Sequence, residues 1–294
     1  MIKSGYAALI GKPNAGKSTL MNAMLDFKLS AVNPKVQTTR NKILGIITGK
    51  DHQLIFIDTP GILEPKYEMQ KFMAKEIRSS LKEADVILYI LDAQNINLND
   101  VKKTEEEFKG DFRRVNRIVV LNKIDLIPQE NVQQKMIELR DEFGFNDIIP
   151  VSAISKFNLD TLKARIIELL PEGDFYYDPD TLTNKPEKFF VSEIIRENIL
   201  NLYQEEIPYS VFVDVREFKV REETQKDYIN VDIILERESQ KMILLGKNGD
   251  MIKRLGEMSR KGIEEFLGKE VFLKLFVKVR KDWRKDFRFL KSNF

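Results

Sequence analysis

The chain has 294 residues, 43% of them hydrophobic and 32% charged, with one histidine and no cysteine. This length and composition are typical of a soluble globular protein with about two domains. The lack of cysteine excludes disulfides, thiolate metal sites and cysteine nucleophiles, and it fits a reducing, cytoplasmic compartment. No stretch of about 20 residues is free of charge, and the first residues resemble a buried strand more than a signal peptide, so we expect no membrane-spanning segment.

The net charge of +2 hides an uneven distribution along the chain. Residues 1–172 carry 25 basic and 23 acidic side chains, residues 173–240 carry 8 and 16, and residues 241–294 carry 15 and 7. A strongly basic end beside an acidic segment indicates a polyanionic partner, either nucleic acid or an acidic lipid surface.

The first half of the chain alternates short apolar segments with amphipathic stretches of helix length. Strands that alternate with helices form βαβ units and a mainly parallel sheet. The exception is 43–57, where residues 48–52 are too few for a crossover helix, so we expect an antiparallel hairpin with His52 solvated in its turn. The expected strands are 5–10, 43–47, 53–57, 85–91, 116–121 and 147–151, and the expected helices are 17–25, 67–82, 99–109, 130–142 and 158–170.

Both periodicities stop at residues 171–187, PEGDFYYDPDTLTNKPE, whose prolines, glycine and acids are typical of a linker. The order of elements beyond it predicts a small α+β domain. We therefore expect an α/β domain over 1–172, a linker over 173–187 and a second domain over 188–294. The elements expected after the linker are a helix at 189–204, strands at 209–220 and 226–236, helices near 239–245 and 250–266, and a strand at 270–280.

A glycine-rich loop lies between the first expected strand and the first expected helix. The pattern G-x-x-x-x-G-K-[ST] in this position is typical of a phosphate-binding P-loop. Its glycines let backbone amides surround phosphate oxygens, Lys17 supplies a charge to the β- and γ-phosphates, and the Ser18 hydroxyl is placed to ligate Mg²⁺. The predicted nucleotide-binding residues of this loop are Gly11, Lys12, Pro13, Asn14, Ala15, Gly16, Lys17, Ser18 and Thr19.

The motif Asp58-Thr59-Pro60-Gly61 follows the expected strand QLIFI. Its aspartate is positioned to hold Mg²⁺, through water, and the Gly61 amide can sense the γ-phosphate. The next residue is Ile62, where Ras-type enzymes carry a glutamine that orients the attacking water. Because Ile62 cannot orient water, we expect slow intrinsic turnover or help from elsewhere.

Between the P-loop and the hairpin lies Gln37-Thr38-Thr39-Arg40. A threonine in this region of GTPases coordinates Mg²⁺ and reports the γ-phosphate. Thr39, directly before the arginine, is the favoured residue, and Thr38 is the alternative. The predicted metal ligands are therefore Ser18, Thr39 and Asp58.

The base is expected to be read by two further motifs, each placed just after a strand. Asn122-Lys123-Ile124-Asp125 presents a carboxylate at Asp125 that can accept from N1–H and the exocyclic amine of guanine. Adenine would leave that carboxylate unpaired, which is a strong source of discrimination. In Ser152-Ala153, the Ala153 amide can reach guanine O6. The four motifs in this order match the translation-factor class of P-loop GTPases, with ligands at the carboxyl ends of a parallel sheet.

Asn14 has two open interpretations. In GTPases with a Gly-x-Pro-Asn-x-Gly-Lys-Ser loop, an asparagine at this place can ligate K⁺ beside the phosphates, where the cation would replace an arginine finger. Alternatively, Asn14 only shapes the loop. The predicted catalytic residues are Lys17, Thr39, Gly61 and Asn14.

In the basic end of the chain, Gly246-Lys247-Asn248-Gly249 separates two expected helices. A G-x-x-G turn between helices is how KH domains clamp about four nucleotides of single-stranded nucleic acid. The predicted RNA-binding residues are Gly246, Lys247, Asn248, Gly249, Ile252, Lys253 and Arg254. The apolar face expected on the second helix comprises Met251, Ile252, Leu255, Met258, Ile263, Phe266 and Leu267. The aromatic and basic segment 281–291 either lies on a membrane or RNA, or forms a terminal helix that caps the sheet.

Together the P-loop, QTTR, DTPG, NKID, VSA and GKNG-DMIKRLGEMSRKGIEEFLGKEVFLKLFVKVRKDWR resemble the Era family of bacterial GTPases over essentially the whole chain. The resemblance implies a GTPase domain followed by a type II KH domain, and GTP hydrolysis with Mg²⁺. It also implies binding to the 3′ end of 16S rRNA, a role in maturation of the small (30S) ribosomal subunit, and a cytoplasmic protein with peripheral membrane association. Two positions depart from the family pattern: Asn248 stands where a small residue is more frequent, and Ser259 replaces a common alanine.

The favoured hypothesis is a monomeric enzyme used as a switch, in which GTP controls an RNA-binding domain. The alternative is a membrane-surface GTPase whose basic end binds acidic lipids. The G-x-x-G turn favours RNA, because lipid binding does not need such a turn. A tRNA-modifying GTPase is disfavoured by the lack of cysteine and of a second catalytic constellation.

Overall fold

The computed structural model describes residues 1–33, 35, 38–222 and 225–293, and these divide into two compact units. The first comprises residues 1–66 and 70–184, and the second comprises residues 67–69 and 185–294. Gln37 lies outside the described residues.

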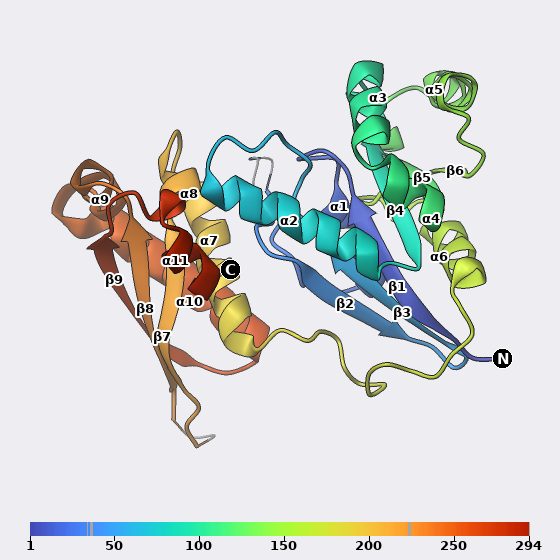
Figure 1. Ribbon diagram of the computed structural model, residues 1–294. Coiled ribbons are helices and arrows are strands. Elements are labelled where there is room, and N and C mark those ends of the chain that lie inside the picture. The colour runs from blue at the N-terminus through green and yellow to red at the C-terminus, as the bar shows by residue number, and fades with distance from the viewer. Residues whose placement is uncertain (34, 36–37, 223–224, 294) are drawn as a thin grey trace. The chain divides into compact units, whose positions relative to one another are not determined.

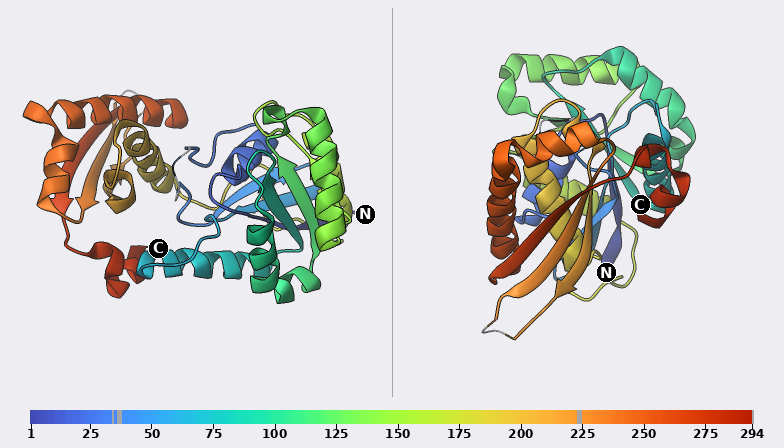
Figure 2. Two further views of the ribbon diagram at one scale, coloured as in Figure 1. Left: turned by 90° about the horizontal axis from the view of Figure 1, so that it is seen from above. Right: turned by 90° about the vertical axis from the view of Figure 1, so that its left-hand side faces the viewer.

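The first unit is built on a six-stranded sheet with the order β2-β3-β1-β4-β5-β6. All neighbours are parallel except β2 and β3, which form the expected antiparallel hairpin. The inner strands are buried on both faces because helices cover both sides of the sheet, as Figures 1 and 2 show. The strands are β1 (Lys3–Ile10), β2 (Ile43–Thr48), β3 (His52–Asp58), β4 (Val86–Asp92), β5 (Asn116–Asn122) and β6 (Ile148–Pro150).

The helices of the first unit lie close to the expected ranges, with one difference. The expected helix 99–109 is followed by a further short helix, and Phe108, with non-helical backbone angles, separates the two. One face of the sheet packs against α2, α3 and α5 in a continuous apolar core. The helices are α1 (Lys17–Leu25), α2 (Glu68–Glu83), α3 (Leu98–Glu107), α4 (Lys109–Arg114), the 3-10 turn η1 (Ile124–Leu126), α5 (Gln129–Phe143) and α6 (Leu159–Leu169).

Most of the expected linker, residues 173–187, belongs to the first unit in the structure. The buried Gln53 side chain accepts hydrogen bonds from the amides of Tyr176 and Tyr177 and donates one to the carbonyl of Tyr177. The amide of Ile46 in β2 also bonds to the carbonyl of Leu182. The segment therefore runs along the edge of the sheet, and the boundary between the units falls after residue 184. His52 was expected to be solvated in the turn. In the structure it is the first residue of β3, and its side chain is only 16% exposed.

The second unit contains a three-stranded sheet with the order β7-β8-β9, in which β7 and β8 are antiparallel and β8 and β9 are parallel. Helices α7 to α10 pack on one face of the sheet around a separate apolar core. The elements are α7 (Glu187–Leu202), α8 (Ile207–Ser210), β7 (Phe212–Lys219), β8 (Asp227–Leu235), α9 (Glu238–Leu245), η2 (Lys247–Gly249), α10 (Asp250–Leu267), β9 (Val271–Val279), η3 (Trp283–Lys285) and α11 (Phe287–Asn293).

The buried face of α10 differs from the predicted one at a single turn. Met258 is 37% exposed, whereas Ser259 is fully buried and its hydroxyl accepts a hydrogen bond from Asn198. The reason is helical geometry: Leu255, Ser259 and Ile263 follow one another at four-residue steps, and Met258 is turned away from that row. The sequence prediction chose Met258 because it is hydrophobic, although the four-residue spacing points to Ser259.

Three ion pairs join the acidic segment to the basic segment inside this unit. Acidic side chains of β8 and its flanks form ion pairs with basic ones of β9 and the segments beside it. These pairs are Lys269–Asp227, Lys278–Asp232 and Arg284–Glu236. The opposite charges therefore hold one small domain together.

The C-terminal segment caps the sheet rather than extending away from it. Trp283 is fully buried, and its Nε1 donates a 3.0 Å hydrogen bond to the carbonyl of Ser210. Its ring contacts Phe212 and Phe289, and Leu290 is buried beside it. In the part of the chain that the structure describes, no helix is long and apolar enough to cross a membrane.

If Trp283 anchors the tail, Trp283→Ala should lower the free energy of unfolding of the second unit by about 3–5 kcal/mol, the usual cost of removing a buried aromatic side chain. Chemical denaturation followed by circular dichroism measures this. Phe287→Ala is the matched control, because Phe287 lies in the same segment and is 58% exposed. Equal small effects of both substitutions would contradict a capping role.

Candidate functional site

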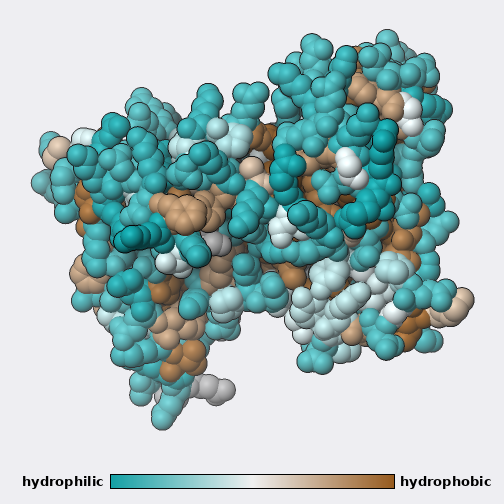
Figure 3. All heavy atoms as spheres, viewed as in Figure 1, coloured by the Kyte–Doolittle hydropathy of each residue, from teal (hydrophilic) through white to brown (hydrophobic). Residues whose placement is uncertain are grey.

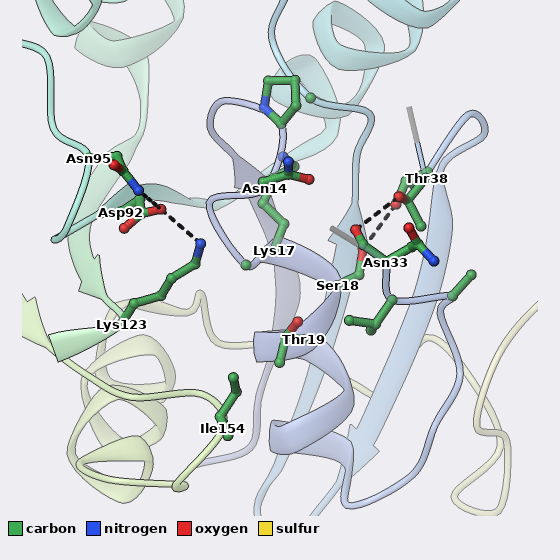
Figure 4. A pocket seen from close by; sticks show the side chains of 16 residues that line it. Asn14, Lys17, Ser18, Thr19, Asn33, Thr38, Asp92, Asn95, Lys123 and Ile154 are labelled. Atoms are coloured by element: carbon green, nitrogen blue, oxygen red, sulfur yellow. Dashed lines mark hydrogen bonds and ion pairs between the residues drawn. The ribbon is translucent and has the colours of Figure 1, made fainter. Parts of the chain in front are cut away.

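A pocket of about 440 Å³ opens at the carboxyl ends of the parallel strands in the first unit (Figure 4). Nine of the predicted nucleotide-site residues line it, as does Thr38, the alternative metal ligand. The other ten do not line it: Gly11, Lys12, Ala15, Asp58, Thr59, Pro60, Asn122, Asp125, Ser152 and Ala153. The nine that line it are Pro13, Asn14, Gly16, Lys17, Ser18, Thr19, Thr39, Gly61 and Lys123.

The P-loop depends on the absence of side chains at two glycines. Gly11 and Gly16 have φ angles of +153° and +96°. A Cβ on Gly11 would lie 2.4 Å from the carbonyl oxygen of Ile90, and one on Gly16 would lie 2.2 Å from Nδ2 of Asn122. Gly16 is also the N-cap of α1, so the first amides of that helix face the pocket.

Lys17 is buried beneath this loop, with 6% of its surface exposed. Its Nζ donates hydrogen bonds to the carbonyl oxygens of Gly11 at 3.0 Å and Lys12 at 2.9 Å. Burial lowers the pKa of the Lys17 ammonium to about 8, and the charge of Asp58 opposes that shift only in part. The loop thus places a cation where phosphate oxygens would bind.

The three predicted metal ligands come together at one point. Ser18 Oγ donates to Asp58 Oδ2 at 2.6 Å and lies 2.9 Å from Thr39 Oγ1, which is itself 3.5 Å from the same carboxylate oxygen. Burial raises the pKa of the Asp58 carboxyl, while the Ser18 hydrogen bond and the Lys17 charge act in the opposite direction. Asp58 Oδ1 and Ser30 Oγ are buried and make no hydrogen bond of standard geometry among the described residues, although Ser30 is close enough to help lower the pKa of the Asp58 carboxyl. One carboxylate, two hydroxyls and an unused carboxylate oxygen fit a hydrated Mg²⁺.

The two threonines of the QTTR segment have different partners. The Thr38 hydroxyl donates to the carbonyl oxygens of Lys35 at 2.6 Å and Asn33 at 3.3 Å, within its own loop. The Thr39 hydroxyl is the one beside Ser18 and Asp58. The geometry therefore favours Thr39 over the alternative.

The loop after β3 packs directly on the P-loop. The amide of Ile62 donates to the carbonyl of Gly11 at 3.0 Å, and a Cβ on Gly61 would lie 2.7 Å from Pro13. Thr59 ties the loop to β1 through a 2.6 Å hydrogen bond from its hydroxyl to the Leu9 carbonyl. Ile62 packs against the apolar core, so its side chain serves the fold and offers no polar group to water.

Asn122 connects the phosphate side of the pocket to the base side. Its side-chain nitrogen donates to the Ala15 carbonyl at 2.9 Å, and its side-chain oxygen accepts from the Ala153 amide at 3.1 Å. Asp125 is exposed in η1, where its carboxylate can meet a base. The buried Asn122 amide thus joins the P-loop to the loop of Ser152 and Ala153.

The sequence prediction missed residues that complete the base side. Lys123 Nζ donates to Asp92 Oδ2 at 2.8 Å, and Asn95 donates to the same oxygen, as Figure 4 shows. Burial opposes ionisation of Asp92, but the Lys123 and Asn95 hydrogen bonds outweigh it and hold the pKa of that carboxyl below its ordinary value. Asp92 ends β4, so its position at a strand terminus could have revealed it. Ile154, 76% exposed, also lines the pocket, as do Ala31, Val32 and Asn33.

In the second unit, the predicted G-x-x-G turn is η2, between α9 and α10. Gly246, Asn248 and Gly249 have φ angles of +74°, +55° and +79°. A Cβ on Gly246 would lie 2.3 Å from Asp250 Oδ1, whereas one on Gly249 would meet only Ile252 at 3.9 Å. The remaining predicted RNA contacts, Lys247, Asn248, Lys253 and Arg254, are exposed, and Ile252 packs partly against the core.

Known proteins match both units. A family model described as a 50S ribosome-binding GTPase matches residues 6–123, and a KH domain model matches residues 206–284. GTPase Era of Thermoanaerobacter sp. (strain X514) is 44% identical over 294 residues, covering 99% of this chain and 95% of that protein. The chain belongs to the Era family of GTPases. GTPase Era of Caldanaerobacter subterraneus is 43% identical over 292 residues, covering 99% and 97% of the two chains.

Two solved Era structures match nearly the full length of this chain. Era in complex with MgGDPNP and nucleotides 1506–1542 of 16S ribosomal RNA has a TM-score of 0.95 and 38% identity, covering 100% of this chain and 99% of that one. An Era variant from Aquifex aeolicus bound to GDP.AlF4⁻ has a TM-score of 0.93 and 37% identity, covering 99% of each chain. The α/β GTPase fold followed by a KH domain is thereby confirmed, and the protein is an enzyme that hydrolyses GTP.

Thr39 and Thr38 provide a test variant and a matched control for the metal site. Thr39→Ala should lower single-turnover GTP hydrolysis at limiting Mg²⁺ by at least about tenfold, because loss of a metal contact is at least as costly as loss of a residue behind one. Thr38→Ala should change it little, since its hydroxyl bonds within its own loop. A larger effect at Thr38 would reverse the assignment.

Proposed function

We propose that this protein is a GTP-dependent switch that binds Mg²⁺ with its nucleotide and binds the 3′ end of 16S rRNA during maturation of the small ribosomal subunit. One observation carries the proposal: a complete nucleotide pocket and a glycine turn of the KH type occur in one chain. A relative of 38% identity over the full length was crystallised with both ligands. The proposal assigns catalysis to residues before 185 and RNA binding to the residues after them.

The chain's own groups suffice to hold a nucleoside triphosphate. The amides at the start of α1 and the Lys17 ammonium face the phosphates, and Gly61, after β3, lies in close contact with Pro13 of the P-loop. Mg²⁺ held by Ser18, Thr39 and Asp58, directly or through water, supplies positive charge to the phosphate oxygens. Guanine is read by Asp125, with Lys123 beside it. The predicted contact of the Ala153 amide with guanine O6 would require that amide to leave the Asn122 oxygen to which it donates in this structure.

Ile62, in the loop after β3, cannot orient the attacking water, because its side chain is apolar and packs against the core. We propose that Asn14, which lines the pocket with φ +63°, holds K⁺ beside the phosphates. That cation would supply the charge that an arginine finger supplies in other GTPases. The alternative, a purely loop-shaping asparagine, is distinguished by the cation test below.

RNA binding is proposed at η2 and the start of α10. Gly249 presents backbone with no side chain in the way, and Lys247, Lys253 and Arg254 supply exposed positive charge. Asn248 lies in the turn, and the partly exposed Ile252 can contact a base. We place this activity in the cytoplasm, on a monomer. The alternative of a membrane-surface GTPase is not favoured, because Trp283, the obvious interfacial anchor of the tail, is fully buried.

Asp125→Asn should weaken GTP binding by at least about 100-fold and improve binding of xanthosine triphosphate. A carboxylate accepts from guanine N1–H and the amine, whereas the new amide can donate to the C2 carbonyl of xanthine. Competition of the two nucleotides against a fluorescent GDP analogue measures the switch. Equal affinity of the unaltered protein for ATP and GTP would refute the role of Asp125.

Replacing Na⁺ by K⁺ at fixed ionic strength should raise the rate of GTP hydrolysis several-fold, by about 1 kcal/mol or more of transition-state stabilisation. Asn14→Ala should abolish the difference between the two cations while leaving GDP affinity nearly unchanged. If the rate is the same in both salts, Asn14 has only a structural role.

Gly249→Asp should reduce affinity for the 16S RNA fragment by at least about tenfold, because a carboxylate would face the phosphates. The turn has room for the new side chain, but the φ of +79° at Gly249 strains any residue other than glycine, so circular dichroism of the variant must first show that the unit folds. Lys247→Ala should be milder and lower the salt dependence by about one phosphate contact. GTP binding should be unchanged in both variants, because the nucleotide pocket lies in the first unit, and a parallel loss of GTP binding would contradict a role confined to RNA binding.

The same titrations performed with GDP and with a non-hydrolysable GTP analogue test the switch. If nucleotide state gates RNA binding, RNA must change the ratio of the two nucleotide affinities by the same factor. Equal RNA affinities in both states would leave a GTPase and an RNA binder that merely share a chain.

A further inference from the structure

We propose that the second unit carries a second binding surface for single-stranded RNA, on the face of its sheet opposite to α7 to α10. This surface, the open face, consists of Tyr228 of β8 and Phe272, Lys274, Phe276 and Lys278 of β9. The inference rests on the proposed RNA-binding function, but it concerns residues outside the glycine turn of η2.

The open face arises from strict alternation along β9. Val271, Leu273, Leu275 and Val277 turn toward the apolar core under the helices. Phe272 and Phe276 turn the other way and remain 55% and 40% exposed. Because side chains two residues apart share a face of a strand, Lys274 and Lys278 lie in the same row as the two rings.

The rings of the open face are arranged for stacking. Phe272 pairs in register with Tyr228 on β8, and the two rings are stacked at 5.9 Å with an interplanar angle of 11°. Lys274 Nζ lies 5.1 Å from the centroid of the Phe276 ring. Phe272 and Phe276 are four residues apart, roughly 13 Å along the strand, so each ring can take a separate base of an extended chain.

The charge of the open face suits a polyanion. Lys274 and Lys278 are both exposed. The strand register places three carboxylates on the same side of the sheet, Asp232 of β8 and Asp214 and Glu217 of β7, and each of them has a basic partner. Lys278 bonds Asp232 at 2.6 Å, Arg216 bonds Asp214 at 2.8 Å, and Lys219 bonds Glu217 at 2.5 Å. Arg221 lies over the Tyr228 ring at 5.8 Å and adds a further positive group at the end of the row. Lysines interleaved with exposed aromatic rings are the arrangement that tracks a phosphate backbone and stacks its bases.

A purely structural role explains the lysines but not the rings. β9 is an edge strand of the sheet, and lysines on an edge discourage pairing with other chains. Exposed phenylalanines on the same strand act in the opposite direction, because they favour aggregation. The tail residues Trp283 and Phe289 cover apolar groups near Phe212 at the start of β7. Apolar patches remain visible on this side of the unit in Figure 3.

The experiment uses the full-length protein and a fluorescein-labelled oligouridylate of 20 nucleotides. Phe272→Leu combined with Phe276→Leu removes both rings but keeps apolar, strand-compatible side chains. We expect at least a fivefold loss of RNA affinity, with unchanged GTP hydrolysis. Phe287→Leu is the matched control, an exposed phenylalanine of the same unit outside the sheet, and should change nothing.

The glycine-turn variant separates this surface from the proposed KH site. If the surfaces act independently, the ring substitutions should weaken binding by the same factor with and without Gly249→Asp. An oligouridylate containing 4-thiouridine should in addition cross-link to the peptide of residues 271–279, and this cross-link should disappear in the ring variant.

Unchanged RNA affinity in the ring variant, together with a loss in Gly249→Asp, would overturn the inference and leave the proposed function standing. If the unaltered protein binds neither this RNA nor the 16S fragment, the proposed function fails and the inference falls with it. If the ring variant keeps its RNA affinity but loses binding to vesicles of anionic phospholipid, the open face is a lipid surface, and the RNA assignment is wrong.

Discussion

The buried side-chain amide of Asn122 is the interaction on which the nucleotide pocket depends. Its nitrogen and oxygen join the carbonyl of Ala15 in the P-loop to the amide of Ala153 after β6. Its own backbone carbonyl accepts from Ala93, after β4. One residue at the end of β5 therefore fixes three loops from separate parts of the chain. The contact is possible only because Gly16 has no side chain, since a Cβ there would lie 2.2 Å from the Asn122 nitrogen.

Two ionisable groups of the pocket, Lys17 and Asp58, are buried, and their charged forms would be stabilised by a bound nucleotide and metal ion. Burial lowers the pKa of Lys17 to about 8 and raises that of Asp58. Near neutral pH the unfolded chain carries both charges in water, so burying them reduces stability. For Lys17, the unfolded state binds more protons between about pH 8 and its ordinary value of 10.5, and stability therefore rises with pH in that window. Phosphate and Mg²⁺ would compensate both charges, which links ligand binding to the stability of the pocket.

The alternation of strands and helices, the hairpin and the P-loop were predictable because each depends on local pattern or on a short motif. The pairing of Lys123 with Asp92 was not, since these residues are far apart in sequence and meet only when β4 and β5 lie side by side. The packing of residues 173–184 on the first unit was not predictable for the same reason. Their prolines and acids indicate a linker, and their hydrogen bonds are to Gln53, which is distant in sequence. The residue assignments for GTP, Mg²⁺ and RNA remain predictions, although the geometry brings the first two sets together.

In each unit a glycine is the N-cap of a helix that can bind an anion, but the two helix ends differ in how strongly they can do so. Gly16 precedes α1 and Gly249 precedes α10, each as an N-cap with positive φ and without a side-chain hydrogen bond to the helix. Glycine caps leave the first amides of a helix available to an anion. In α1 no acidic residue stands in the first turn, and Lys17 lies beside the amides. In α10 the first residue is Asp250, whose carboxylate already accepts a hydrogen bond from the Met251 amide. A phosphate at α10 must compete with that carboxylate, so this turn cannot hold an anion as tightly as the P-loop does. RNA binding by the second unit therefore has to draw on contacts spread over a wider surface, whereas nucleotide binding by the first can rely on a single loop.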